Sequence, residues 1–303
     1  MKKTFRREKC APKPRGTRSL NFTCYSEKDL FDLKGAWDRQ HNFDKIKATD
    51  ARGVHAELKQ KYNTCDRESC WQPDKTIVDR VFAPKMPKTW KRNINEWLSS
   101  NDSLKVMTQF EKSFPEFEFL GPSPTDYFVK EYGNTCVWPE LCKFNLKNWI
   151  DRGKTQIGVI FNLDPHYESG SHWVALYINT VSRNIYYFDS TGDRIHKHIS
   201  KFRKEVQSQA LHQLNQKYTF DSNYNVEHQY KNTECGMYVL FFIITMLLHD
   251  KDYPSDKEPV RIGKNLKAQI GGSYTFFSRV FKNNQLKFPD KLMENLRHEY
   301  FNE

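Results

Sequence analysis

The run Gln229-Tyr-Lys-Asn-Thr-Glu-Cys235-Gly-Met-Tyr-Val-Leu-Phe-Phe242 places a thiol at the start of a strongly apolar segment. That segment ends at Leu248 and is far shorter than the ~20 residues of a membrane span, so it predicts a buried helix from Cys235 to about His249. A thiol at a helix N-terminus faces free N–H groups and the positive end of the helix dipole, both of which favour the thiolate. The run therefore predicts a nucleophilic cysteine.

Three apolar strands are expected upstream of this helix, at residues 156–162, 172–179 and 184–189. His172 begins the second strand and Asp189 ends the third. A hairpin-length turn joins these two strands, and in antiparallel neighbours the start of one strand lies beside the end of the other. We therefore expect the imidazole and the carboxylate to lie close together despite being 17 residues apart.

These side chains are the equipment of a cysteine hydrolase. His172 would activate the Cys235 thiol, and Asp189 would orient the imidazole and stabilise its cation. Gln229, six residues before the thiol, would donate an amide N–H to the developing oxyanion. Each of these residues taken alone is more commonly structural, but their joint placement at the ends of predicted elements favours catalysis.

Other elements follow from periodicity and capping signals. Ser26 is a plausible N-cap with Asp29 three residues on, and Asp102 is expected to cap a helix that ends near Phe114. The remaining predictions are helical structure within 25–62, a loop through Pro115 and 121–124, a helix at 140–152, an amphipathic helix from Ile195 to Leu214, a short strand within 217–226 and a helix at 290–301.

Hairpin strands packed by long helices indicate an α+β fold. We expect three parts: a basic flexible arm at 1–24, a mainly helical accessory domain at 25–97 and a catalytic domain at 98–303. A soft boundary is also indicated at Pro84 and Pro87.

Much of the positive charge lies at the N-terminus. The formal net charge is +11, and the first eighteen residues carry eight Lys and Arg against Glu8 alone, or +7. This composition, together with Pro12 and Pro14, predicts a solvated flexible tail. The alternative is contact with nucleic acid or an acidic scaffold through these cations.

The seven cysteines are an odd number, and no apolar stretch follows the charged N-terminus as in a signal peptide. Free thiols in a reducing compartment are therefore expected. Cys65 with Cys70, and Cys136 with Cys142, lack the usual zinc-site spacing, so no metal site is expected. No organic cofactor motif is present either.

The motifs together resemble a known family. Gly170-Ser-His172-Trp173, Tyr186-Tyr-Phe-Asp189-Ser and Gln229-x5-Cys235-Gly-Met-Tyr resemble the ubiquitin-like-protein-specific (SUMO-protease-like) cysteine proteases over about residues 156–249. The resemblance implies a papain-like core with a central mixed sheet flanked by helices. It also implies the roles given above to His172, Asp189, Cys235 and Gln229.

Segments outside the core narrow the resemblance to the viral branch, which includes the African swine fever virus polyprotein-processing protease and its giant-virus counterparts. Those segments are Cys65-Asp-Arg-Glu-Ser-Cys70, Arg80-Val-Phe-Ala-Pro84 and Phe288-Pro-Asp-Lys-Leu-Met293. The branch implies cleavage of viral structural polyproteins after Gly-Gly during virion assembly. It also implies a location in the host cytoplasm, at the viral assembly site, and in the virion.

A preference for Gly-Gly requires a narrow groove that excludes Cβ atoms. By resemblance, Trp173 lines this groove, although a strand Trp also packs in cores. Trp138 and Tyr132 are candidates for a second aromatic wall, and Asn162 at a strand end could face the cleft.

Two other functions stay open. One is a deconjugase that removes ubiquitin-like modifiers, which shares the chemistry but needs a broad surface for a folded substrate. The other is a non-catalytic basic virion protein that binds DNA, which the four-residue constellation disfavours. The run Gly271-Gly-Ser273 also makes self-cleavage conceivable, although a plain turn is the simpler interpretation.

Overall fold

A computed structural model describes residues 4–14, 16–248, 277, 280–283 and 287–303. The chain divides into two compact units: residues up to Met86 together with His298–Glu303, and Pro87–Arg297. This division differs from the predicted boundary after residue 97. Residues 87–97 join the second unit, where Trp90 stacks under the Arg297 guanidinium at 4.5 Å.

The first unit is helical. Its helices are α1 (Glu27–Gln40), α2 (Ala51–Lys61) and α3 (Lys75–Val81), with a 3-10 turn at Glu68–Trp71. Ser26 caps α1 through a reciprocal capping box with Asp29, as the sequence predicts. The core of this unit includes Leu30, Leu33, Val54, Leu58 and Trp71.

The prediction of a flexible arm at 1–24 is wrong for the residues that the structure describes. The Glu8 carboxylate accepts from the backbone N–H and hydroxyl of Ser69 at 2.7 and 2.6 Å. Lys9 donates its backbone N–H to Asn302 at 2.6 Å, and Phe5 packs on Trp71. The basic composition of residues 1–24 predicts flexibility because it is dominated by lysines and arginines. The few apolar and acidic residues between them, such as Phe5 and Glu8, hold the segment in place.

Six of the seven cysteines are paired in the structure: Cys10 with Cys24, Cys65 with Cys70, and Cys136 with Cys142. The expectation of free thiols is therefore wrong for these six. Spacing along the chain does not show whether two cysteines meet, and the pairing of Cys10 with Cys24 depends on how the N-terminal segment folds back on itself. Cys235 is the free cysteine, and it is buried.

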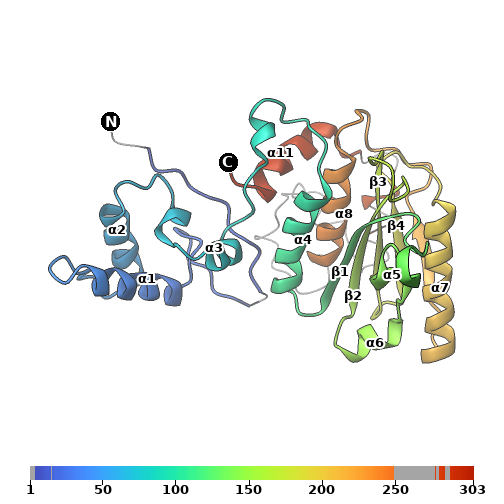
Figure 1. Ribbon diagram of the computed structural model, residues 1–303, viewed down its shortest axis with the longest axis horizontal. Coiled ribbons are helices and arrows are strands. Elements are labelled where there is room, and N and C mark those ends of the chain that lie inside the picture. Colours follow the sequence, from blue (N-terminus) through green and yellow to red (C-terminus); the bar gives the residue numbers. More distant parts are fainter. Residues whose placement is uncertain (1–3, 15, 249–276, 278–279, 284–286) are drawn as a thin grey trace. The chain divides into compact units, whose positions relative to one another are not determined.

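The second unit is built on one mixed sheet in the order β1-β2-β3-β4-β5 (Figure 1). Its strands are β1 (Phe117–Pro124), β2 (Gln156–Asn162), β3 (Trp173–Asn179), β4 (Asn184–Phe188) and β5 (Thr219–Ser222). The three central strands pair antiparallel as predicted, while β1 and β5 add parallel strands at the two edges.

The predicted loop through 121–124 is wrong, because these residues belong to β1. The register with β2 shifts between Leu120 and Ser123, around Gly121-Pro122. Proline is tolerated there because β1 is an edge strand, where one row of backbone N–H groups has no strand partner.

The helices of the second unit are α4 (Ser100–Ser113), α5 (Pro139–Cys142), α6 (Leu146–Asp151), α7 (Lys197–Leu214), α8 (Cys235–Leu248) and α11 (Asp290–Tyr300), which ends in the first unit. Two predictions need correction. Ser99, not Asp102, caps α4, and Asp102 is the acidic partner three residues on in the capping box. The single helix expected at 140–152 is divided into α5 and α6, because Asn145 caps a new helix.

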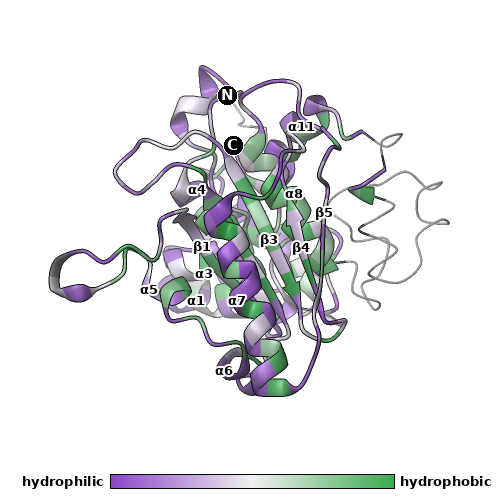
Figure 2. Cartoon of the chain, turned by 90° about the vertical axis from the view of Figure 1, so that its right-hand side faces the viewer, coloured by the Kyte–Doolittle hydropathy of each residue, from purple (hydrophilic) through white to green (hydrophobic). Residues whose placement is uncertain are grey.

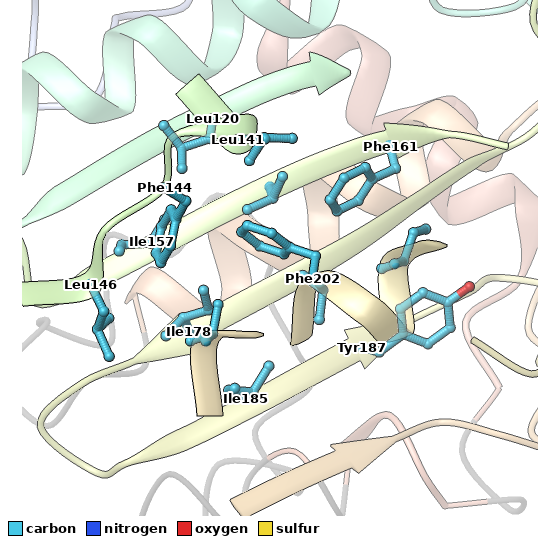
Figure 3. Close-up of a cluster of buried hydrophobic side chains, with 14 of the residues drawn as sticks. Leu120, Leu141, Phe144, Leu146, Ile157, Phe161, Ile178, Ile185, Tyr187 and Phe202 are labelled. Carbon is cyan, nitrogen blue, oxygen red and sulfur yellow. The ribbon is translucent and has the colours of Figure 1, made fainter. Parts of the chain in front are cut away.

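The sheet is buried on both faces. Side chains of one face, such as Ile157, Ile178 and Tyr187, form a core with Phe202 of α7 (Figure 3). On the other face α8 contacts β2 and β3, and α4 contacts β1. Figure 2 shows that α7 carries hydrophilic residues along one side, whereas every residue of α8 is buried. Among the described helices none is long and apolar enough to cross a membrane.

Candidate active site

His172 and Asp189 lie together at one end of the β3–β4 hairpin. His172 immediately precedes β3 and Asp189 immediately follows β4, and the strands pair antiparallel with Ala175 opposite Phe188. The His172 Nε2 atom is 2.7 Å from Asp189 Oδ1. The Asp189 side chain is only 1% exposed, so water competes little for this bond. The imidazole of His172 and the carboxylate of Asp189 therefore lie close together, as the hairpin predicts.

Cys235 is the first residue of α8, and its thiol forms a side-chain hydrogen bond with His172. Because Nε2 of the ring faces Asp189, the other ring nitrogen is left for the sulfur. Burial lowers the pKa of His172, but the hydrogen bonds to Asp189 and Cys235 and their charges outweigh it and raise the pKa to about 10. The ring is therefore a cation at neutral pH, placed between a carboxylate and a thiol.

Asp189 is itself held by several groups. Burial raises the pKa of Asp189, and the bonds from His172 and Thr191 more than offset this, so that its pKa is lowered. Thr191 donates both its backbone N–H and its hydroxyl, at 3.0 and 2.7 Å. Asn223 accepts the Asp189 backbone N–H at 2.9 Å and donates to the Asp189 carbonyl at 2.6 Å. The carboxylate is thus fixed in its ionised form.

Gln229 lies beside this group through Ser190. The Ser190 hydroxyl donates to Gln229 Oε1 at 2.7 Å, and the Gln229 backbone N–H donates to the Ser190 carbonyl at 2.9 Å. The Gln229 amide nitrogen donates to the Lys231 carbonyl. Gln229 is buried and precedes α8 in a loop.

Leu98 links the start of α8 to the strand that carries Trp173. The Trp173 indole N–H donates to the Leu98 carbonyl at 3.2 Å. A Cβ atom on Gly236 would lie 2.6 Å from the Leu98 Cβ, which is closer than real Cβ atoms approach. The glycine after Cys235 therefore lets α8 approach this segment.

A cavity of about 750 Å³ is lined by Trp173, Asn162 and Trp138. Its lining includes Trp173, the residue after His172 in the chain, but not His172, Asp189 or Cys235 themselves. The Asn162 side-chain oxygen, Oδ1, accepts from the backbone N–H groups of Asp164 and Ser171, at 3.0 and 3.2 Å. Asn162 thus organises the loop before His172 as well as facing the cavity.

Two of the sequence-based predictions concern parts that the structure does not describe, namely the side chain of Tyr132 and the run 271–273. Sequence reasoning missed Ser190, Asn223 and Leu98. Ser190 directly follows Asp189 in the quoted motif, so its position was visible, whereas its contact with Gln229 was not. Within the described ranges no group of His, Cys, Asp and Glu side chains is arranged to hold a metal ion.

Sequence comparison identifies the protein family of this chain. The profile of the Ulp1 protease family, C-terminal catalytic domain, matches residues 95–269, which is more than half of the 303 residues. The chain belongs to this family. Its members are cysteine proteases, so the predicted enzyme class and the resemblance to SUMO-protease-like enzymes are confirmed.

Proteins of two viruses are similar to this chain. A protein of Acanthamoeba polyphaga mimivirus, named as a thiol protease, is 27% identical over 255 residues that cover 75% of this chain and 81% of that protein. The SUMO-1 cysteine protease of African swine fever virus is 29% identical over 96 residues, covering 31% of this chain and 35% of that protein. These matches confirm the predicted resemblance to the viral branch of the family.

A solved structure shares the fold. The crystal structure of the African swine fever virus protease superposes with a TM-score of 0.56 at 17% identity, and the match covers 97% of this chain and 95% of that chain. The predicted α+β class with a central mixed sheet is confirmed.

Proposed function

We propose that this protein is a viral cysteine endopeptidase that cleaves structural polyproteins after Gly-Gly sequences. The observation that carries the proposal is the continuous contact from Cys235 through His172 to Asp189, with the nucleophile at a helix N-terminus. A buried thiol with no catalytic partner would need neither the cation nor the carboxylate beside it.

The chemistry follows from these positions. The Cys235 sulfur attacks the scissile carbonyl carbon, and the oxyanion accepts hydrogen bonds from the Gln229 amide and the Cys235 backbone N–H. His172 gives its proton to the leaving amine, so the C–N bond breaks and a thioester remains. Water, deprotonated by His172, then attacks the thioester and releases the acid and the thiol.

The substrate preference is proposed from the cavity. Trp173 and Asn162 line it, and Trp173 directly follows His172 in the chain, so an extended peptide bound in this cavity would contact Trp173 close to the scissile bond. A chain without Cβ atoms can approach an aromatic wall more closely than any other sequence. Polyprotein cleavage would take place at the assembly site in the host cytoplasm and in the virion.

A second candidate function is the removal of a ubiquitin-like modifier. The observation in its favour is the name of the African swine fever virus relative, a SUMO-1 cysteine protease. Both functions use the same four residues, and they differ in whether a folded modifier or an extended peptide is recognised.

The test is a panel of Gly-Gly-x peptides and a folded SUMO or ubiquitin fusion, each incubated with wild type and with Cys235→Ala. Cleavage after the second glycine of peptides, lost in the variant, would support the endopeptidase. Cleavage of the fusion alone would support the deconjugase instead. If wild type cleaves neither substrate and iodoacetamide labels Cys235 no faster than a small free thiol, the catalytic proposal is wrong.

Nucleic-acid binding by residues 1–24 stays a prediction. Arg6 keeps a 60% exposed side chain even though the backbone of this segment is packed. If the segment binds nucleic acid, replacing Arg6 and Arg7 with Ser should weaken a salt-sensitive association and leave peptide cleavage intact. If the variant associates with nucleic acid as strongly as wild type in low salt, nucleic-acid binding by this segment is contradicted.

A further inference from the structure

Ser190 contacts Gln229 at both the backbone and the side chain. Its hydroxyl is fully buried and donates to Gln229 Oε1 at 2.7 Å. Its carbonyl accepts the backbone N–H groups of His228 and Gln229, at 2.8 and 2.9 Å. The loop before α8 is therefore held to the end of β4 at the residue that carries the amide.

The two hydrogen-bond partners of the Gln229 side-chain amide determine the positions of its oxygen and its nitrogen. The Lys231 carbonyl can only accept a hydrogen bond, so it must face the amide nitrogen, and the Ser190 hydroxyl then donates to the amide oxygen. The NH₂ group has two hydrogens and Lys231 takes one of them. The second remains for an oxyanion. A flipped amide would instead present its oxygen, which repels an oxyanion.

The neighbouring residues Asp189 and Ser190 position two different side chains of the proposed site. Asp189 orients His172, and Ser190 orients Gln229. Asn223, which is fully buried, binds the Asp189 backbone on both sides of the residue. Two consecutive residues at the end of β4 therefore set both the imidazole and the amide.

We propose that Ser190 is a positioning residue that holds the Gln229 amide with its NH₂ group toward the oxyanion, while Asn223 fixes the Asp189–Ser190 turn. This inference rests on the proposed function, in which Gln229 stabilises the oxyanion. A single oxyanion donor contributes about 10²–10³-fold in kcat. Ser190 does not touch the substrate and acts through that donor, so its own effect is smaller.

The test is a double-mutant cycle of Ser190→Ala and Gln229→Ala on peptide cleavage. Ser190→Ala should lower kcat about 10-fold and change KM less than about 2-fold. In the Gln229→Ala background the same change should alter kcat less than about 2-fold, because the residue through which Ser190 acts is gone. Ser190→Thr, which keeps the hydroxyl, should recover most of the rate.

Alkylation of Cys235 by iodoacetamide is the second readout. That displacement forms no oxyanion on a carbonyl, so Ser190→Ala and Gln229→Ala should both alkylate at the wild-type rate. Ser182→Ala is the matched control, since the Ser182 hydroxyl, in the turn between β3 and β4, has no hydrogen-bond partner among the residues that the structure describes. It should change neither rate.

The outcomes distinguish a wrong oxyanion assignment for Gln229 from a wrong positioning role for Ser190. If Gln229→Ala leaves kcat unchanged, the oxyanion assignment fails and the role of Ser190 fails with it. If Gln229→Ala lowers kcat but Ser190→Ala does not, only the inference about Ser190 is wrong. Equal losses in both backgrounds, or slowed alkylation in Ser190→Ala, would also overturn it, because Ser190 would then act on the fold or on Cys235.

Discussion

Glu234 and Arg297 form an ion pair whose side chains are both fully buried, and Glu234 directly precedes Cys235. The Arg297 Nη2 and Nε atoms lie 3.0 and 3.1 Å from Glu234 Oε2. Burial raises the pKa of Glu234, and the charge and hydrogen bonds of Arg297 oppose this. The pair ties α11 to the residue from which α8 starts.

Arg297→Met should destabilise the protein by about 3–5 kcal/mol, because it leaves a buried carboxylate without its partner. The measurement is the free energy of unfolding in urea. Lys291→Met on the same helix is the control, since Lys291 pairs with Glu294 at the surface and should change stability by less than about 1 kcal/mol. A loss no larger than that of the control would contradict the importance of the pair.

His172 should make the stability depend on pH in the alkaline range. Its pKa rises from 6.5 to about 10 on folding, so its contribution is full below pH 6.5 and is lost as the pH rises through about 10. The difference in unfolding free energy between wild type and His172→Gln should therefore shrink from neutral pH to about pH 10. Urea titrations of both proteins check this, and a constant difference would show that folding does not raise this pKa.

Asp189→Asn should lower kcat by about 10²–10⁴-fold, because the amide cannot stabilise the His172 cation. The pKa of His172 should fall as well, since its bond and charge interaction with Asp189 raise it. The alkaline limb of the pH–rate profile should then move to lower pH. If the alkaline limb stays at the same pH in Asp189→Asn, a group other than His172 determines that limb.

Gly236→Ala should destabilise the protein by about 1–3 kcal/mol and lower activity, because the new Cβ would lie 2.6 Å from the Leu98 Cβ. Gly35→Ala is the matched control in a helix. There the nearest atom to the new Cβ is the end of the Arg39 side chain at 3.4 Å, and the change should stabilise by about 0.4–1 kcal/mol. Thermal unfolding compares the two variants, and equal shifts would show that Leu98 moves away without cost.

Asn162→Leu should reduce kcat/KM about 10-fold, because two backbone N–H groups in the loop before His172 lose their acceptor. Asn162→Asp keeps an acceptor oxygen and should lose less. Hydrogen exchange at the Ser171 amide provides the direct readout and should be faster in the leucine variant. Slow exchange in both variants would restrict Asn162 to lining the cavity.

Some elements could be predicted because their signals are local. The apolar run after Cys235, the apolar strands on either side of the turn at 180–183 and the Ser26–Asp29 capping box depend on residues within a few positions of one another. The edge strand β1 cannot be predicted in the same way, because Gly121-Pro122 signals a turn and only pairing with β2 makes these residues a strand. The packing of the N-terminal segment also depends on distant residues, since its partners Ser69 and Asn302 are far along the chain.

The sequence by itself determined which chemical groups the site contains and which ends of the elements carry them, because helix starts and hairpin ends follow from local patterns. Only the tertiary structure decided how these groups are held. The contacts of Ser190 with Gln229, of Asn223 with Asp189 and of Arg297 with Glu234 join residues 34 to 63 positions apart. Such contacts form when buried polar groups must find partners in a packed interior, and no local pattern specifies which partner they find.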